Sequence, residues 1–147
     1  MERLVLVSLS ILTFTGKSFG DEHVHVKYQE DEDVTLPCTF STSLTDSRID
    51  WKQDGKNGRK DVFLWEYGTV QLSSQDEHFK DRVSHFPDKI KHGNASIIIK
   101  NAKVSDSGTY TCLYVNRGET DPEEYHKVIL TVGHLPFSTA LPLLTMA

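Results

Sequence analysis

The stretch NAKVSDSGTYTC, residues 101–112, decides the fold of this chain. Tyr110 stands two residues before Cys112, and Asp106 and Gly108 lie just upstream. Side chains alternate along a β-strand, so Tyr110 and Cys112 are expected to point to the same face. The stretch therefore predicts a turn that leads into a strand carrying an inward Tyr and an inward Cys.

Three other pieces accompany this turn: VTLPC at residues 34–38, Trp51, and the pair Arg82 and Val83. Together the four pieces resemble a V-type immunoglobulin domain spanning residues 21–132. The resemblance implies an all-β fold, a V-type antiparallel β-sandwich. In such a sandwich Tyr110 packs in the core with its hydroxyl bonded back to the turn.

The same resemblance implies two specific pairings. Cys112 needs a partner on the other sheet, and Cys38 is the only other cysteine in the sequence. We therefore expect one inter-sheet disulfide between them, packed against the core residue Trp51. Arg82 occupies the position where V-type domains keep an Arg that forms an ion pair with an Asp before the strand of the second Cys, here Asp106.

Length and composition agree with one exported domain. The chain has 147 residues, of which 37% are hydrophobic and 25% charged, enough to build a packed core. The net charge of −5 argues against nucleic acid as a partner, since nucleic-acid binding needs a basic stripe. Two cysteines behind an export signal favour a disulfide over free thiols.

Residues 1–20 read as a signal peptide. Arg3 precedes an apolar run at residues 4–12, and Ser18 and Gly20 supply the small residues of a cleavage site. The alternative, a membrane anchor, needs a longer apolar run than this one. Residues 133–147 are expected to be a disordered tail without a membrane-spanning segment. The protein is then extracellular: secreted as written, or on the outer face of the plasma membrane if a longer form exists.

Eight strands are expected in the domain, at residues 22–28, 34–40, 49–53, 62–67, 82–86, 95–100, 112–115 and 125–132. The stretch at residues 68–80 reads as a polar loop with room for one short strand near residues 70–72. In the fourth, alternation places Phe63, Trp65 and Tyr67 on one face, expected to be core, and Val62, Leu64 and Glu66 on the other. Asn94 opens the one Asn-x-Ser/Thr sequence of the chain and is a predicted glycosylation site.

The outer face of the sheet that carries Trp51 and Cys112 is the predicted partner-binding surface. An apolar patch rimmed by charge marks an interface more often than an ordinary surface. The residues expected there are Lys52, Leu64, Glu66, Leu113, Val115 and Tyr125.

Catalytic and metal-binding motifs are missing from the sequence. It contains no nucleophile elbow, no HExxH and no paired Cys clusters, so we expect no enzyme, no cofactor, no metal site and no small-molecule substrate. His23 and His25 alternate along the first expected strand and read as a solvated edge rather than as metal ligands.

The last expected strand, YHKVILTV at residues 125–132, lacks the Phe-Gly-x-Gly of antigen receptors. Residues 77–112 instead resemble butyrophilin-like and related costimulatory ligands. That resemblance implies an immune-regulatory ligand or receptor ectodomain that binds a protein receptor on an immune cell. The alternative function is a self-associating adhesion or scaffold module.

Overall fold

Two β-sheets hold all the strands in residues 23–136, the part of the chain that the computed structural model describes. The expected signal peptide and most of the expected tail lie outside these residues. The strands are β1 (Val24–Gln29), β2 (Val34–Leu36), β3 (Ser47–Gly55), β4 (Gly58–Glu66), β5 (Thr69–Val70), β6 (Val83–His85), β7 (Ile97–Ile99), β8 (Gly108–Asn116) and β9 (Glu124–Gly133).

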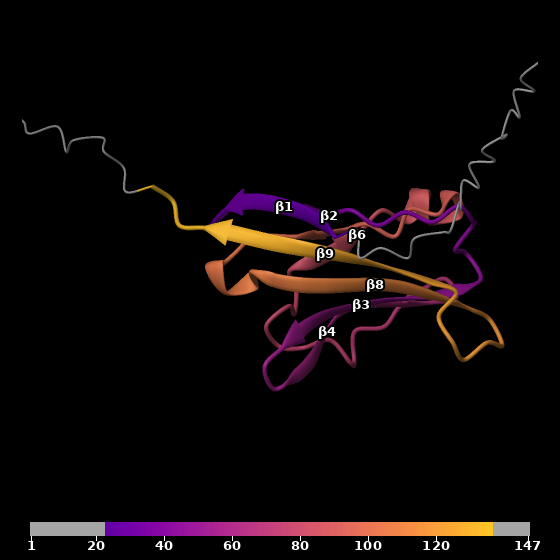
Figure 1. The fold of residues 1–147 in the computed structure, drawn as a ribbon. Helices are drawn as coiled ribbons and strands as arrows, with labels where there is room; N and C mark the ends of the chain where they lie inside the picture. Colours follow the sequence, from indigo (N-terminus) through magenta and orange to yellow (C-terminus); the bar gives the residue numbers. More distant parts are fainter. Residues whose placement is uncertain (1–22, 137–147) are drawn as a thin grey trace, which may run out of the picture.

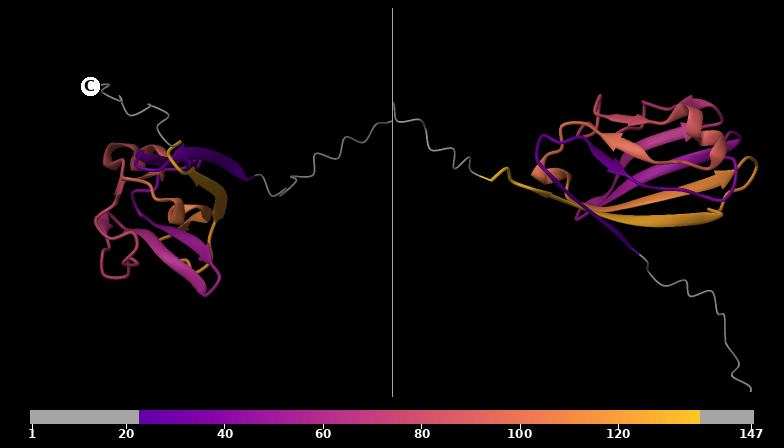
Figure 2. Two further views of the ribbon diagram at one scale, coloured as in Figure 1. Left: turned by 90° about the vertical axis from the view of Figure 1, so that its left-hand side faces the viewer. Right: turned by 90° about the horizontal axis from the view of Figure 1, so that it is seen from above.

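The larger sheet has the order β1-β9-β8-β3-β4-β5, and the smaller has the order β2-β7-β6. Figure 1 shows the long strands β9, β8, β3 and β4 running side by side, and the views in Figure 2 show the two sheets facing each other. The pairings are antiparallel except for β1, which runs parallel to β9 with Val24 opposite Val128. The predicted all-β V-type sandwich is confirmed.

The core lies between the sheets and is centred on the disulfide. Cys38 and Cys112 are bonded across the two sheets with their Cα atoms 6.5 Å apart, as predicted. Trp51 beside them is fully buried, and its indole Nε1 donates a hydrogen bond to the carbonyl of Ala95 at 2.8 Å. A buried Trp needs such a partner for its N–H, so this bond ties β3 to the segment that leads into β7 of the smaller sheet.

The end of β2 and the helix after β6 depart from the expectation for reasons of backbone chemistry. Strand β2 ends at Leu36 rather than at residue 40, because Pro37 has no N–H to donate to a ladder. The 3₁₀ helix η1 (Pro87–His92) was not expected. It ends at Gly93, whose φ of 83° lies in the left-handed region that favours glycine.

Two predictions about side-chain direction in and next to β4 are wrong. Val62 is fully buried, because the β3–β4 register shifts between Trp51 and Lys52 and the resulting bulge breaks the alternation. Tyr67 is 40% exposed rather than core, because it takes a φ of 47° just after the strand ends at Glu66.

Candidate recognition surface

The outer face of the six-stranded sheet, the side turned away from the smaller sheet, carries ordered rows of side chains. In the central row, Leu64 of β4 is opposite Asp50 of β3, Asp50 is opposite Leu113 of β8, and Leu113 is opposite Tyr125 of β9. Directly opposite side chains on one face lie within contact distance. The row therefore forms a continuous band across four strands.

A second row flanks this band on the side of the β4–β5 turn. It consists of Glu66, Arg48 and Val115, on β4, β3 and β8. On the other side a third row contains Asp61, Lys52, Thr111 and Lys127.

The six residues expected on this surface do share the outer face, but they are unequally exposed. Tyr125 is 58% exposed, whereas Val115 is only 9% exposed. Lys52, Leu64, Glu66 and Leu113 are half-buried. Tyr125 therefore offers the largest free aromatic surface, and Val115 contributes little contact area.

A ladder of charges runs through the same face, and sequence reasoning missed most of it. Lys52 Nζ lies 2.5 Å from Asp61 Oδ1 and 3.4 Å from Asp50 Oδ2. Arg48 lies 3.4 Å from Asp50 and 3.8 Å from Glu66. Alternation marks Arg48 and Asp50 as outward, but only the bulge at Val62 brings Asp61 opposite Lys52. No signal in the sequence reveals that bulge.

The ladder holds a nearly buried carboxylate at the centre of the band. Asp50 is only 5% exposed and is flanked by the cations of Arg48 and Lys52. Burial works against the charge of Lys52, but the hydrogen bond to Asp61 and the nearby Asp50 outweigh it and raise the Lys52 pKa. The two cations thus hold the Asp50 carboxylate in place between Leu64 and Leu113.

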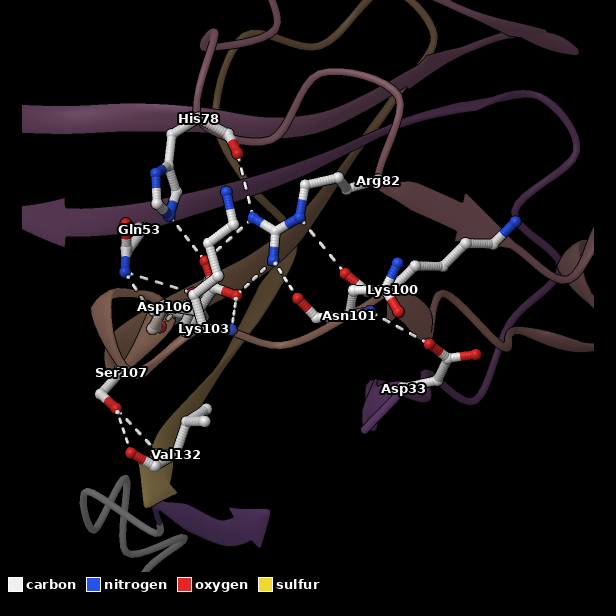
Figure 3. A network of polar contacts seen from close by, with 11 residues as sticks. Asp33, Gln53, His78, Arg82, Lys100, Asn101, Lys103, Asp106, Ser107 and Val132 are labelled. Atoms are coloured by element: carbon white, nitrogen blue, oxygen red, sulfur yellow. Dashed lines mark hydrogen bonds and ion pairs between the residues drawn. The ribbon is translucent and has the colours of Figure 1, made fainter. Parts of the chain in front are cut away.

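A buried ion pair anchors the start of β8 (Figure 3). Arg82 Nη2 lies 2.5 Å from Asp106 Oδ2, and the Asp106 side chain is fully buried. The carboxylate also has His78 Nε2 at 2.6 Å and accepts a hydrogen bond from the Lys103 backbone N–H at 2.8 Å. Burial disfavours the charge of Asp106, yet the bond from Arg82 and these other contacts lower its pKa overall.

The tyrosine corner completes this anchor. The Tyr110 hydroxyl donates to the backbone carbonyl of Asp106, and Gln53 Nε2 of β3 donates to the same carbonyl at 3.2 Å. Burial raises the pKa of Tyr110, so its hydroxyl remains a donor across the physiological range. The corner fixes β8 against β3 and thereby holds the outward residues of both strands in register.

Side-chain contacts join three loops at the end of the same sheet that lies opposite the tyrosine corner: the loop before β3, the β4–β5 turn and the β8–β9 loop. Arg117 in the β8–β9 loop lies 2.6 Å from Asp46, which precedes β3, and stacks over the Tyr67 ring at 4.1 Å. The Ser47 hydroxyl donates to Asn116 Oδ1 at 3.3 Å. Cation–π and ion-pair contacts of this kind orient exposed loops. The end of the sheet next to the band is thus ordered by side-chain contacts.

Asn94 is half-buried at the junction of η1 and β7. Within residues 23–136, no group of three or more His, Cys, Asp or Glu side chains could hold a metal ion. The same residues form no helix that is long and apolar enough to cross a membrane.

Comparison with known proteins agrees with the V-type fold described above. The family model of the immunoglobulin V-set domain matches residues 21–132. The human V-set domain-containing T-cell activation inhibitor 1 is 40% identical over 86 residues, 57% of this chain and 30% of that protein. Bovine myelin protein zero-like protein 3 is 33% identical over 123 residues, 80% of this chain and 50% of that protein. The chain therefore spans half or less of the length of these relatives.

Two solved structures have a fold similar to that of this chain. The human B7-H4 IgV-like domain superposes with a TM-score of 0.63 at 32% identity, covering 76% of this chain and 93% of that one. Bovine butyrophilin superposes with a TM-score of 0.60 at 27% identity, covering 78% of this chain and 52% of that one.

Proposed function

The chain belongs to the immunoglobulin V-set family, and on that premise we propose that it is an extracellular immune-regulatory module that binds a protein receptor on lymphocytes. It works by recognition rather than by catalysis. The name of the human relative, a T-cell activation inhibitor, supports this class of function. The likeness to butyrophilin agrees with the resemblance found in residues 77–112.

The central band of the outer face is the observation that carries the proposal. Antiparallel sheets usually turn polar residues to solvent, yet this band places Leu64, Leu113 and Tyr125 in one row. Tyr is a common anchor of protein interfaces. The partner docks on this band, and the ladder of Arg48, Asp50, Lys52 and Asp61 supplies fixed charges that select its orientation.

Self-association through the same band is the second candidate, because the ladder presents both signs of charge and can pair with a copy of itself. One experiment separates the two. Labelled, purified domain is titrated onto lymphocytes, and its sedimentation is followed over a wide range of concentration. Saturable binding by a monomer supports the receptor-binding function. A concentration-dependent dimer without cell binding supports the adhesion or scaffold function.

A further inference from the structure

The outer face of the six-stranded sheet carries unmatched charge of opposite sign at its two ends. At one end, three acidic residues of the β8–β9 loop are exposed, Glu119, Asp121 and Glu123. None of them forms an ion pair with another residue in the described part of the chain. The cation of this loop, Arg117, is already paired with Asp46. The loop therefore presents a negative surface to a partner.

Lysines without an ionic partner lie toward the other end of the face. Lys127 of β9 is opposite Thr111 of β8, and Lys27 of β1 is opposite Thr131 of β9. Alternation from Tyr125 places Lys127 and Thr131 on the outer face, and Lys27 shares that face with Thr131. Neither lysine forms an ion pair with any other residue that the structure describes. This end of the face is therefore positive.

Thr111 adds a buried hydroxyl to the positive end. It lies in the row between Lys52 and Lys127 and is only 5% exposed. Its Oγ1 has no hydrogen-bond partner among the described residues, and a buried hydroxyl in this state costs free energy that a new acceptor can recover. Lys52 is committed to Asp61 and Asp50, so Lys127 is the cation left to accompany that acceptor. A hydroxyl donor beside a free ammonium group suits a carboxylate oxygen.

The two charged ends are far enough apart to act separately. Glu123 precedes β9, and Lys127 follows it by four residues, about 13 Å along an extended strand. Lys27 lies further on, opposite Thr131, toward the end to which β9 runs in Figure 1. Both spacings exceed the Debye length of about 8 Å at physiological salt. Each end therefore selects its own complement in a partner, and Tyr125 lies between them.

We propose that the lymphocyte receptor docks on this face in one direction only, with a cationic surface against the β8–β9 loop and a carboxylate at Thr111 and Lys127. The inference rests on the proposed receptor-binding function and adds the chemistry of the partner. Tyr125 remains the anchor between the two charged contacts. A receptor turned end for end would bring like charges together at both ends, and such contacts suppress wrong docking.

A second copy of the chain suits the face less well than a receptor of this kind. Two copies packed face to face with parallel strands would bring the carboxylates of both β8–β9 loops together. With antiparallel strands the signs match, but three unmatched carboxylates then meet two unmatched lysines at each end. Chains with a net charge of −5 also repel each other at a distance. A receptor with the complementary charge pattern meets neither obstacle.

The first test neutralises the loop in the full chain. Glu119→Gln, Asp121→Asn and Glu123→Gln are combined in one variant, and the association of the labelled protein with lymphocytes is followed at several salt concentrations. The variant should associate about tenfold more slowly than the wild type at low salt, because attraction to the cationic surface of the receptor is lost. Its association rate should also depend less on salt.

A matched control changes the net charge by the same amount away from the outer face. It combines Glu77→Gln, Asp81→Asn and Asp88→Asn, three exposed positions in the segment before β6 and in η1. If only the local charge of the loop matters, the control should associate with lymphocytes as fast as the wild type.

The second test changes the positive end. Lys127→Glu should weaken equilibrium binding to lymphocytes by about tenfold or more, whereas Lys91→Glu at an exposed position of η1 should bind as the wild type. Thr111→Val keeps the shape of the side chain and removes the hydroxyl, so binding should weaken by about tenfold. Its urea midpoint should not fall, because the hydroxyl has no partner to lose. A purely structural hydroxyl would lower the midpoint and leave binding unchanged.

The outcomes separate this inference from the function on which it rests. If the wild type binds lymphocytes and the loop, Lys127 and Thr111 variants bind equally well, the docking direction is wrong and the proposed function stands. If the wild type does not bind lymphocytes, the proposed function fails and the docking direction fails with it. If the variants change only the sedimentation of the protein, the occupant is a second copy, which overturns the assignment to a receptor.

Discussion

Arg82 and Asp106 form an ion pair between a side chain that is only 14% exposed and one that is fully buried, with Nη2 and Oδ2 2.5 Å apart. The pair joins the segment before β6 to the turn before β8. Arg82 also donates to the carbonyls of His78, Lys100 and Asn101. These contacts hold both side chains in one position at the start of β8, the strand that carries Leu113.

Asp106→Ala should lower the free energy of unfolding by about 3 to 5 kcal/mol, because it strands the buried charge of Arg82. Urea denaturation measures the change. The exposed pair Asp54 and Arg59, 3.0 Å apart, is the control, and Asp54→Ala should cost about 1 kcal/mol or less. A double-mutant cycle in which Arg82→Ala and Asp106→Ala are additive would show that the two residues do not interact.

The Cys38–Cys112 disulfide closes a sequence separation of 74 residues. Replacing both residues by Ala should therefore lower the free energy of unfolding by roughly 4 kcal/mol on the chain-entropy model. Denaturant midpoints of the variant and the wild type give the difference. Unreduced mass spectrometry is the direct check on the bond, and free thiols in the folded protein would refute it.

His85 should make the domain less stable in mild acid. Its ring lies 5.3 Å from the Phe63 ring and 5.4 Å from the Trp65 ring, and burial lowers its pKa. The unfolded chain then takes up the proton first, at its ordinary pKa of about 6.5. The stability contributed by neutral His85 is complete above that pH and declines as the pH falls from there toward the folded pKa.

Urea midpoints between about pH 7.5 and pH 5 measure this slope. His85→Gln removes the titrating group, so the variant should lose less stability over this range than the wild type. The contribution of Asp106 falls in a separate window, because its lowered pKa confines the loss to more acidic solution. Equal slopes in wild type and variant would contradict the assignment to His85.

Gly93 and Gly118 provide a matched test of backbone space. Both residues have a backbone φ in the left-handed region, 83° for Gly93 and 87° for Gly118. A Cβ at Gly93 would lie 2.0 Å from the Phe40 carbonyl oxygen, whereas a Cβ at Gly118 would meet nothing within 4 Å. Gly118→Ala should cost about 1 to 2 kcal/mol from backbone conformation alone.

Gly93→Ala should cost clearly more than Gly118→Ala, by about 1 to 3 kcal/mol, because the surrounding backbone must also move. Thermal and urea unfolding of the two variants measure the difference. Similar losses in both would mean that the turn after η1 has room for a side chain.

Much of this architecture could be predicted because alternation is a local rule. Tyr110 and Cys112 point inward, so Leu113 must point outward, and the structure agrees. Exceptions to alternation depend on the partner strand or on one backbone angle. The bulge at Val62 arises from its register with β3, and the direction of Tyr67 arises from its left-handed φ. Neither leaves a mark in the residue pattern.

The residue pattern also could not predict the contacts between segments that are far apart in the chain. The parallel pairing of β1 with β9 joins residues more than a hundred positions apart in the chain. The approach of Lys52 to Asp61 depends on the same bulge as Val62. Sequence could therefore predict which side chains face outward, but not which charges meet.

The outer-face band is tested most directly by measuring the binding of Leu113→Asp and Tyr125→Asp to lymphocytes, together with their self-association. Ser84→Asp, on the smaller sheet opposite Ile98, is the matched control. With folding verified by unchanged unfolding midpoints, each band variant should weaken the interaction by about tenfold or more, as expected for interface anchors, and the control should bind as wild type. If both band variants fold, bind and self-associate like the wild type, the docking face lies elsewhere on the domain.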